Sequence, residues 1–206
     1  MVFPAFFDDA PAIRLRDPLA GFLGSAEDGV MTYRYVDAVR LCGHSCPVVA
    51  GAWLMVLAGL EWLYGDDLPE RGGIEVHMRE GVGQGTTGVV ASVATLVTGA
   101  AAEGGFHGIG AGQLFARRGL LRFEAPIDGV MALRRRDNGE GVVVDIDTGH
   151  VPHDPAMAGL MPRAVAGRAD PAELARFAAL FQDRVRRMLA AADDPKLIHL
   201  YDWPAS

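Results

Sequence analysis

The sequence predicts an α+β fold, in which an antiparallel sheet packs with helices. Apolar segments of helical length dominate the first half of the chain, several short strand patterns follow, and an amphipathic helix comes near the end. Helices and strands therefore occur in separate runs, which is typical of α+β proteins. A length of 206 residues, half of them apolar, is enough for one sizeable core, so we expect a single domain over residues 1–206.

The first thirty residues lack any regular period because proline and glycine interrupt them, and we expect an irregular arm over about 1–30. A helix is predicted over Thr32–Leu41, where apolar residues recur at helical spacing. The segment Gly43–Pro47 interrupts it. Pro47 suits the first turn of a second helix, which we expect to end near Tyr64, before Gly65.

Strand patterns follow in the second half. Apolar and polar residues alternate over Ile74–Arg79, and a third apolar helix is predicted near Val89–Gly99. Further strands are predicted over Gln113–Phe123, Val130–Arg136 and Val142–Ile146, with a hairpin signal at Asp137-Asn138-Gly139. The last helix, about 170–192, begins with Asp170 as cap, Pro171 at the first position and Glu173 three residues after the cap.

Composition excludes several classes of function. The net charge of −7 disfavours nucleic acid as a partner, and the basic run Arg134–Arg136 suits a solvated face. Val48–Leu60 and Val89–Ala102 are shorter than the roughly 20 apolar residues of a membrane span. The N-terminus lacks the basic start of a signal peptide, and two cysteines do not make a disulfide scaffold. We therefore expect a cytoplasmic protein without a membrane partner.

His44 and Cys46 are the leading candidates for chemistry. They lie on either side of Ser45, just before the helix that Pro47 opens. The partial positive charge at a helix N-terminus favours a thiolate, and a thiolate beside an imidazole suits zinc, iron or copper. The alternative is a structural pair, with Cys46 as a small buried hydrophobe and His44 as a capping group. Spacing alone leaves both interpretations open.

The segment Gly43-His44-Ser45-Cys46-Pro47, followed by a glycine- and alanine-rich apolar helix, resembles the opening motif of the FmdE family. This family comprises the FmdE component of formylmethanofuran dehydrogenase and its stand-alone bacterial relatives. Gly110-Ala111-Gly112-Gln113-Leu114 resembles the family's second motif, G-K-G-N-L, and Phe115–Phe123 resembles the strand after it. The resemblance covers about Val30–Ile146 and implies an FmdE-like core domain with a metal site.

The resemblance also implies a further ligand. His107 stands where the family has a cysteine, so it is the third metal ligand that we expect. His77 is the fourth candidate on a different ground: the alternation over Ile74–Arg79 puts it on the polar face of its strand, facing either a cleft or solvent. Ala111 replaces the family's lysine, the cysteine before the third helix has no counterpart, and no cysteine follows Cys46 to build the C-terminal zinc finger of some members. Loop histidines such as His107, and also His150 and His153, are often merely exposed to solvent.

We therefore expect a metal-binding protein with zinc at His44, Cys46 and His107, which converge on one ion. Two alternatives use the same observations: a haem-binding protein with one of these residues as axial ligand, and an accessory subunit of a molybdenum or tungsten enzyme. Whether the protein is an enzyme stays open. The small residues of Val89–Ala102 favour close packing against a second copy, so we expect a homodimer.

Overall fold

The computed structural model describes residues 3–204 and confirms the α+β class. Six α-helices are present in this range: α1 (Pro18–Phe22), α2 (Tyr35–Cys42), α3 (Pro47–Tyr64), α4 (Thr87–Thr98), α5 (Met157–Val165) and α6 (Pro171–Ala190). The seven strands are β1 (Ile13–Arg16), β2 (Val30–Tyr33), β3 (Ile74–Met78), β4 (Leu121–Arg122), β5 (Met131–Arg135), β6 (Gly141–Ile146) and β7 (Ile198–Asp202). Short 3₁₀ turns cover Ala5–Phe7, Glu27–Gly29 and Thr148–His150.

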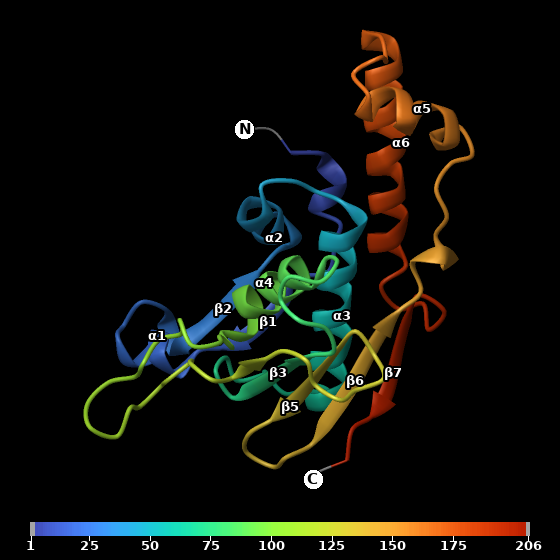
Figure 1. Ribbon diagram of the computed structural model, residues 1–206. Coiled ribbons are helices and arrows are strands. Elements are labelled where there is room, and N and C mark those ends of the chain that lie inside the picture. Colours follow the sequence, from blue (N-terminus) through green and yellow to red (C-terminus); the bar gives the residue numbers. More distant parts are fainter. Residues whose placement is uncertain (1–2, 205–206) are drawn as a thin grey trace.

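The main sheet has the strand order β4-β3-β5-β6-β7. Its neighbours are antiparallel, except that the two-residue strand β4 pairs with β3 in parallel. The hairpin between β5 and β6 forms at the predicted Asp137-Asn138-Gly139 turn, where Gly139 adopts a φ of +79°. A separate antiparallel pair joins β1 to β2. In Figure 1, α3 lies across one face of the main sheet, with α4 and the N-terminal segments beyond it.

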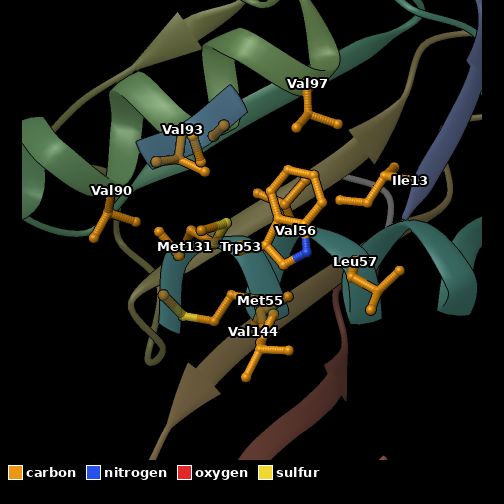
Figure 2. Close-up of a cluster of buried hydrophobic side chains, with 14 of the residues drawn as sticks. Ile13, Trp53, Met55, Val56, Leu57, Val90, Val93, Val97, Met131 and Val144 are labelled. Carbon is orange, nitrogen blue, oxygen red and sulfur yellow. The ribbon is translucent and has the colours of Figure 1, made fainter. Parts of the chain in front are cut away.

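α3 is the centre of the core. A helix that is apolar all round is buried, and α3 has no charged residue before Glu61. It packs against α4, α6 and the strands β5, β6 and β7. Figure 2 shows Trp53 among its buried neighbours, with Val93 and Val97 of α4 nearby and Val144 contributed by the sheet. The indole Nε1 of Trp53 donates a hydrogen bond to the carbonyl of Pro11 at 3.0 Å, which attaches the N-terminal segment to this core.

By length and composition alone, α3 is long and apolar enough to cross a membrane, with a mean hydropathy of 1.5 over 18 residues. In this fold 72% of that segment is buried by other parts of the protein. α3 is therefore accounted for as a core helix, in line with the sequence-based expectation for this segment.

Several expected boundaries were wrong. Residues 13–33 are not an irregular arm, because they contain β1, α1 and β2, whereas residues 1–2 lie outside the described range. The strand expected over Gln113–Phe123 is a loop followed by the short β4. α5 and β7 were not predicted. α5 contains Pro162, a residue type that disfavours the interior of a helix, yet Met157 and Leu160 are buried and α5 packs on α6.

α6 matches its predicted boundaries closely, and its cap is the expected one. The backbone N–H of Glu173 donates to the Asp170 carboxylate at 2.9 Å, and the backbone N–H of Asp170 donates to the Glu173 carboxylate at 2.9 Å. The C-terminal half of α6 carries the buried residues Val185, Met188 and Leu189. The N-terminal half projects past the end of α3 together with α5, forming a helical hairpin that stands out from the body (Figure 1).

Candidate metal centre

The turn between α2 and α3 holds His44, Ser45 and Cys46, and the structure anchors it on two helices. α2 ends at Cys42, and the φ of +76° at the next residue, Gly43, lets the chain reverse. Cys46 is the N-cap residue of α3, directly before Pro47. The Ser45 hydroxyl lies 3.0 Å from the hydroxyl of Tyr35, a buried residue of α2. Gln182 of α6 donates from Nε2 to the Ser45 carbonyl at 2.9 Å. Ser45, the middle residue of the turn, is therefore fixed by contacts with both α2 and α6.

His44 is exposed, and one hydrogen bond determines how its ring can act. Its Nδ1 lies 2.9 Å from the Cys42 carbonyl oxygen. A carbonyl only accepts hydrogen bonds, so this contact requires the proton on Nδ1. In the neutral ring, Nε2 then carries the free lone pair. A backbone carbonyl that orients a histidine in this way is a common outer partner of metal-ligating histidines.

Cys46 is half-buried, and its side chain makes no capping hydrogen bond with α3. Its thiol lies at the N-terminus of an 18-residue helix, where the partial positive charge of the unpaired N–H groups favours an anion. Cys42 is also half-buried, and both cysteines are free thiols. Burial, and secondly the nearby charge of Cys46, raise the pKa of Cys42. Of the two cysteines, only Cys46 lies at the N-terminus of α3.

His107 does not lie with this turn. It is exposed in the loop between α4 and β4, and its Nδ1 lies 3.4 Å from Nη1 of Arg118 in the same loop. That loop packs on α1, since Phe115 contacts Phe22 with ring centroids 5.4 Å apart. The His44 turn instead contacts α6. Within one chain, residues 3–204 bring no three metal-binding side chains together, so His107 does not join His44 and Cys46 in a common site there.

His77 lies on the face of the main sheet that points away from α3. In the strand register it is paired with Ala132, which is paired with Val143, so the three side chains share one face. This face carries a small cluster with Ile127 and Trp203, whereas the opposite face packs on α3. The Nε2 of His77 lies 3.3 Å from the Glu75 carboxylate, and burial lowers the pKa of His77. His77 is thus not a ligand at the His44 turn.

Among residues 3–204, no three histidine, cysteine, aspartate or glutamate side chains gather closely enough to hold a metal ion. The single-chain site with three converging ligands is therefore not formed, and His44 and Cys46 are the two candidates that share one element. The pair His150 and His153 is also divided: Nε2 of His150 lies 2.8 Å from Asp194, while His153 contacts the buried guanidinium of Arg184.

Two groups around the turn were not identified from sequence. Tyr35 appeared only as an apolar residue of a helix pattern, and Gln182 lies 137 residues from Ser45 in the chain. The sequence offered one signal for this contact: Gln182 is a polar residue on the face of α6 that otherwise packs inward. Its contact depends on how α6 crosses the start of α3, and no local pattern encodes that crossing.

The comparisons with known proteins give a similarity of architecture. No protein-family model and no curated protein matches the chain. Among solved structures, a tungsten formylmethanofuran dehydrogenase FmdE-like protein from Syntrophus aciditrophicus is similar, with a TM-score of 0.44 and 17% sequence identity. The similarity covers 84% of this chain and 74% of that one. A likeness of this size says nothing about site residues or activity.

Proposed function

We propose that this protein binds a transition-metal ion, with zinc as the preferred metal, and that His44 and Cys46 are its ligands. The observation that supports this most is the contact between Nδ1 of His44 and the Cys42 carbonyl. It leaves Nε2 of an exposed, oriented imidazole available as a donor. Zinc accepts imidazole nitrogen and thiolate sulfur in the same site.

Cys46 supports the proposal as the second donor. Zinc binds the deprotonated thiol, and the N-terminus of α3 favours the negative charge. The bonds from Tyr35 and Gln182 to Ser45 fix the residue between the two donors, so the backbone that carries them is held before a metal arrives. Such preorganisation reduces the cost of ordering the ligands.

The donor set of one chain is incomplete for a closed zinc site. Structural zinc sites use four protein ligands, and catalytic sites use about three with one open position. His44 and Cys46 supply two, so the remaining positions go to water, to a bound ligand or to residues of a second copy. We therefore expect weaker binding by this chain alone than in a structural zinc finger.

The haem alternative is less well supported. Haem with His44 or Cys46 as axial ligand needs a flat apolar pocket beside the turn, but the apolar helix α3 packs directly on α4. Val49, Ala50 and Trp53 of α3 are fully buried in that contact region, as are Val93 and Ala94 of α4. Haem would have to separate helices that form the core. We expect no Soret band when haem is added to the protein.

Elemental analysis of the purified protein tests the proposal directly. We expect zinc in the wild-type protein after dialysis, and loss of that zinc in His44→Ala and Cys46→Ser. Cobalt substitution adds a specific signature, because a cobalt–thiolate bond produces a charge-transfer band in the near ultraviolet that Cys46→Ser should remove. His199→Ala is the matched control, since His199 lies on β7, and it should retain full metal content. Equal zinc content in wild type, His44→Ala and Cys46→Ser would disprove the site.

The proposed site also has a direction of pH dependence. Protons compete with the metal for the imidazole and the thiolate, so zinc affinity should fall as pH is lowered from about 8 to about 6. Competition titration with a chromophoric chelator at each pH measures this. A zinc affinity that is flat across this range would indicate carboxylate or carbonyl ligands instead of His44 and Cys46.

A further inference from the structure

Two arginines share one carboxylate in the interior, away from the His44 turn. Asp17, the cap of α1, accepts from Nη1 of Arg71 at 3.0 Å and from Nη2 of Arg117 at 2.6 Å. The side chains of Asp17 and Arg117 are only 6% and 7% exposed. Asp17 also accepts from the backbone N–H groups of Leu19 and Ala20. One buried negative charge therefore faces two positive ones.

The donors of Arg117 are not fully used. Arg71 donates to Asp17 and to the carbonyls of Val97 and Leu96, so each of its nitrogens has an acceptor. Arg117 donates to Asp17 alone, and its buried Nη1 has no hydrogen-bond partner among residues 3–204. Buried polar groups without a partner are uncommon, and a bound ion or water is one of the explanations for such a group. The unmatched group here is a cation.

A cavity of about 390 Å³ adjoins these arginines, and a third arginine borders it. Arg71, Gly72, Arg117 and Arg136 line it, with Glu70 as the acidic residue of the lining. The guanidinium of Arg117 lies against the α-carbon of Gly72, where any side chain would collide with it. Arg136 donates from Nη1 to the Gly72 carbonyl at 3.2 Å. Arg117 and Arg136 thus meet at Gly72, and the guanidinium groups of Arg71 and Arg117 lie together at Gly99. With Asp17 and Glu70 counted, the formal charge of these three arginines and two acids is +3 − 2 = +1.

The cavity also has an apolar wall. Pro18, Leu114 and Phe115 form it, with Gln113 as a further polar residue of the lining, and Leu114 is 61% exposed. Phe115 has a φ of +63° and packs on Phe22 of α1, so the loop places its apolar side chains beside the arginines. A cavity of this volume is within the usual range for small-molecule sites, which combine apolar walls with a few convergent polar groups. Guanidinium groups bind carboxylate and phosphate oxygens through paired hydrogen bonds.

We propose that this arginine cavity, formed by Arg71, Arg117 and Arg136 around Gly72, binds a small organic anion that joins a carboxylate or phosphate group to an apolar body. The anionic oxygens bind Arg117 and Arg136, and the apolar body lies against Leu114 and Phe115. The protein has a net charge of −7, so only a local cluster of this kind can attract an anion. The site is separate from the proposed metal centre and does not depend on it.

Calorimetric titration of the full chain with phenyl phosphate and with benzoate tests the proposal. We expect saturable binding of at least one of them, weaker binding of inorganic phosphate, which lacks the apolar body, and none of benzyl alcohol, which lacks the charge. Sodium chloride at matched ionic strength controls for general salt effects. Saturation by phenyl phosphate or by benzoate alone identifies which anionic group the site prefers. Absence of saturable binding for both probes up to about 10 mM, tenfold above a Kd of about 1 mM, would overturn the proposal.

Arginine variants locate the binding. Arg136→Gln removes the charge of an exposed side chain, so the fold should stay intact. The Kd of the probe should rise about tenfold or more, which corresponds to the loss of one hydrogen bond to a charged group. Arg117→Gln should weaken binding of the probe at least as much. If this single variant unfolds because Asp17 loses a partner, the double variant Asp17→Asn/Arg117→Gln is used in its place. Arg186→Gln, on an exposed position of α6, is the matched control and should bind as wild type. Unchanged binding in Arg136→Gln and in the Arg117 variant would place the probe elsewhere and refute the site.

Discussion

His44 and Cys42 show how neighbouring residues of one turn take different roles. Cys42 contributes its backbone carbonyl, which orients the His44 ring, while its thiol is half-buried with a raised pKa. The side chain of Cys42 is therefore dispensable for the proposed metal site, although its backbone is not. This separation of backbone from side chain makes the two cysteines distinguishable by mutation.

We predict that Cys42→Ala retains the bound metal. The alanine keeps the carbonyl that accepts from His44, and only the thiol is lost. Stability should fall on the order of 0.5–1 kcal/mol, because a half-buried sulfur leaves the core edge. Zinc content by elemental analysis and urea unfolding measure the two effects. Loss of zinc from Cys42→Ala, with the fold intact, would make Cys42 a ligand.

His77 carries a pH-dependent contribution to stability. Burial lowers the pKa of His77 in the folded state, against the opposing effect of Glu75, and with smaller effects of Arg122 and Arg134 in the same direction as burial. A histidine with a lowered folded pKa binds protons more readily when the chain is unfolded. Its contribution is therefore complete above its unfolded pKa of about 6.5 and is lost as pH falls below that value.

We therefore predict that His77→Gln flattens the acid side of the stability profile. The free energy of unfolding of wild type should decline between about pH 7 and about pH 5, and the decline should be smaller in the variant. Urea titrations at several pH values measure this. His107→Gln, at an exposed loop histidine, is the control and should follow the wild-type profile. A variant that declines as steeply as wild type would mean that His77 is not responsible.

At the scale of elements, α3 approaches the sheet closely because glycines lie on its inner face. A side-chain carbon at Gly59 would come within 2.7 Å of Leu133 and 3.2 Å of Val144, and one at Gly51 within 2.8 Å of Ile146. These contacts are tighter than ordinary van der Waals distances. Glycine costs helix stability, so its presence at these two positions is explained by packing of α3 on β5 and β6.

Gly59→Val should therefore destabilise the protein by about 1–3 kcal/mol, through overpacking between α3 and the sheet. Denaturant unfolding gives this value. The control is Gly159→Ala on α5, where a side-chain carbon meets open space, and it should be neutral or stabilising by up to about 1 kcal/mol. Equal effects of the two substitutions would remove close packing as the explanation.

The loop between α4 and β4 gives a second test at this scale. Because this loop packs on α1 and places His107 beside Arg118, we expect His107→Ala to leave zinc content unchanged. The comparison with His44→Ala, made in the same elemental analysis, shows whether the two histidines act together. Loss of zinc in both variants would mean that the loop reaches the His44 turn in a state or assembly other than the single chain.

At the scale of the whole molecule, the expected homodimer cannot form through α4, the helix whose small residues suggested it. The small residues of α4 pack inside the chain: Val90, Ala91, Val93, Ala94 and Val97 are all buried. The α5–α6 hairpin instead projects from the body (Figure 1) and exposes apolar side chains, with Val165 81% and Leu174 46% exposed. Projecting apolar surface of this kind is typical of contacts between proteins.

We predict a homodimer that forms through this hairpin. Light scattering across micromolar concentrations should give twice the chain mass of 21.9 kDa. Leu174→Asp should shift the mass toward that of one chain, because a charge on the contact surface is costly to desolvate. Leu41→Asp, at another exposed apolar position, is the control and should leave the mass unchanged. A wild-type mass of one chain at all concentrations would end this prediction.

The sequence by itself determined the elements whose signals are local. The start of α3 at Pro47 and its end before Gly65, the cap of α6, the strand β3 and the Asp137-Asn138-Gly139 hairpin all depend on residues within a few positions of one another. All of them formed as expected. The same holds for the His44–Ser45–Cys46–Pro47 turn, whose position before α3 follows from Pro47. Helix starts, caps and turns are short-range features, so a single sequence is sufficient to predict them.

Only the tertiary structure decided which distant residues meet. It placed His77 on the face of the sheet away from α3, tied the His107 loop to α1 and brought Gln182 to Ser45. The basic run expected on a solvated face is also divided by tertiary contacts: Arg134 lies 3.9 Å from the ring centre of Trp203, and Arg135 lies 4.2 Å from that of Tyr64. Such contacts depend on strand register and helix crossing. These are set by the packing of the whole core, and no spacing within one segment encodes them.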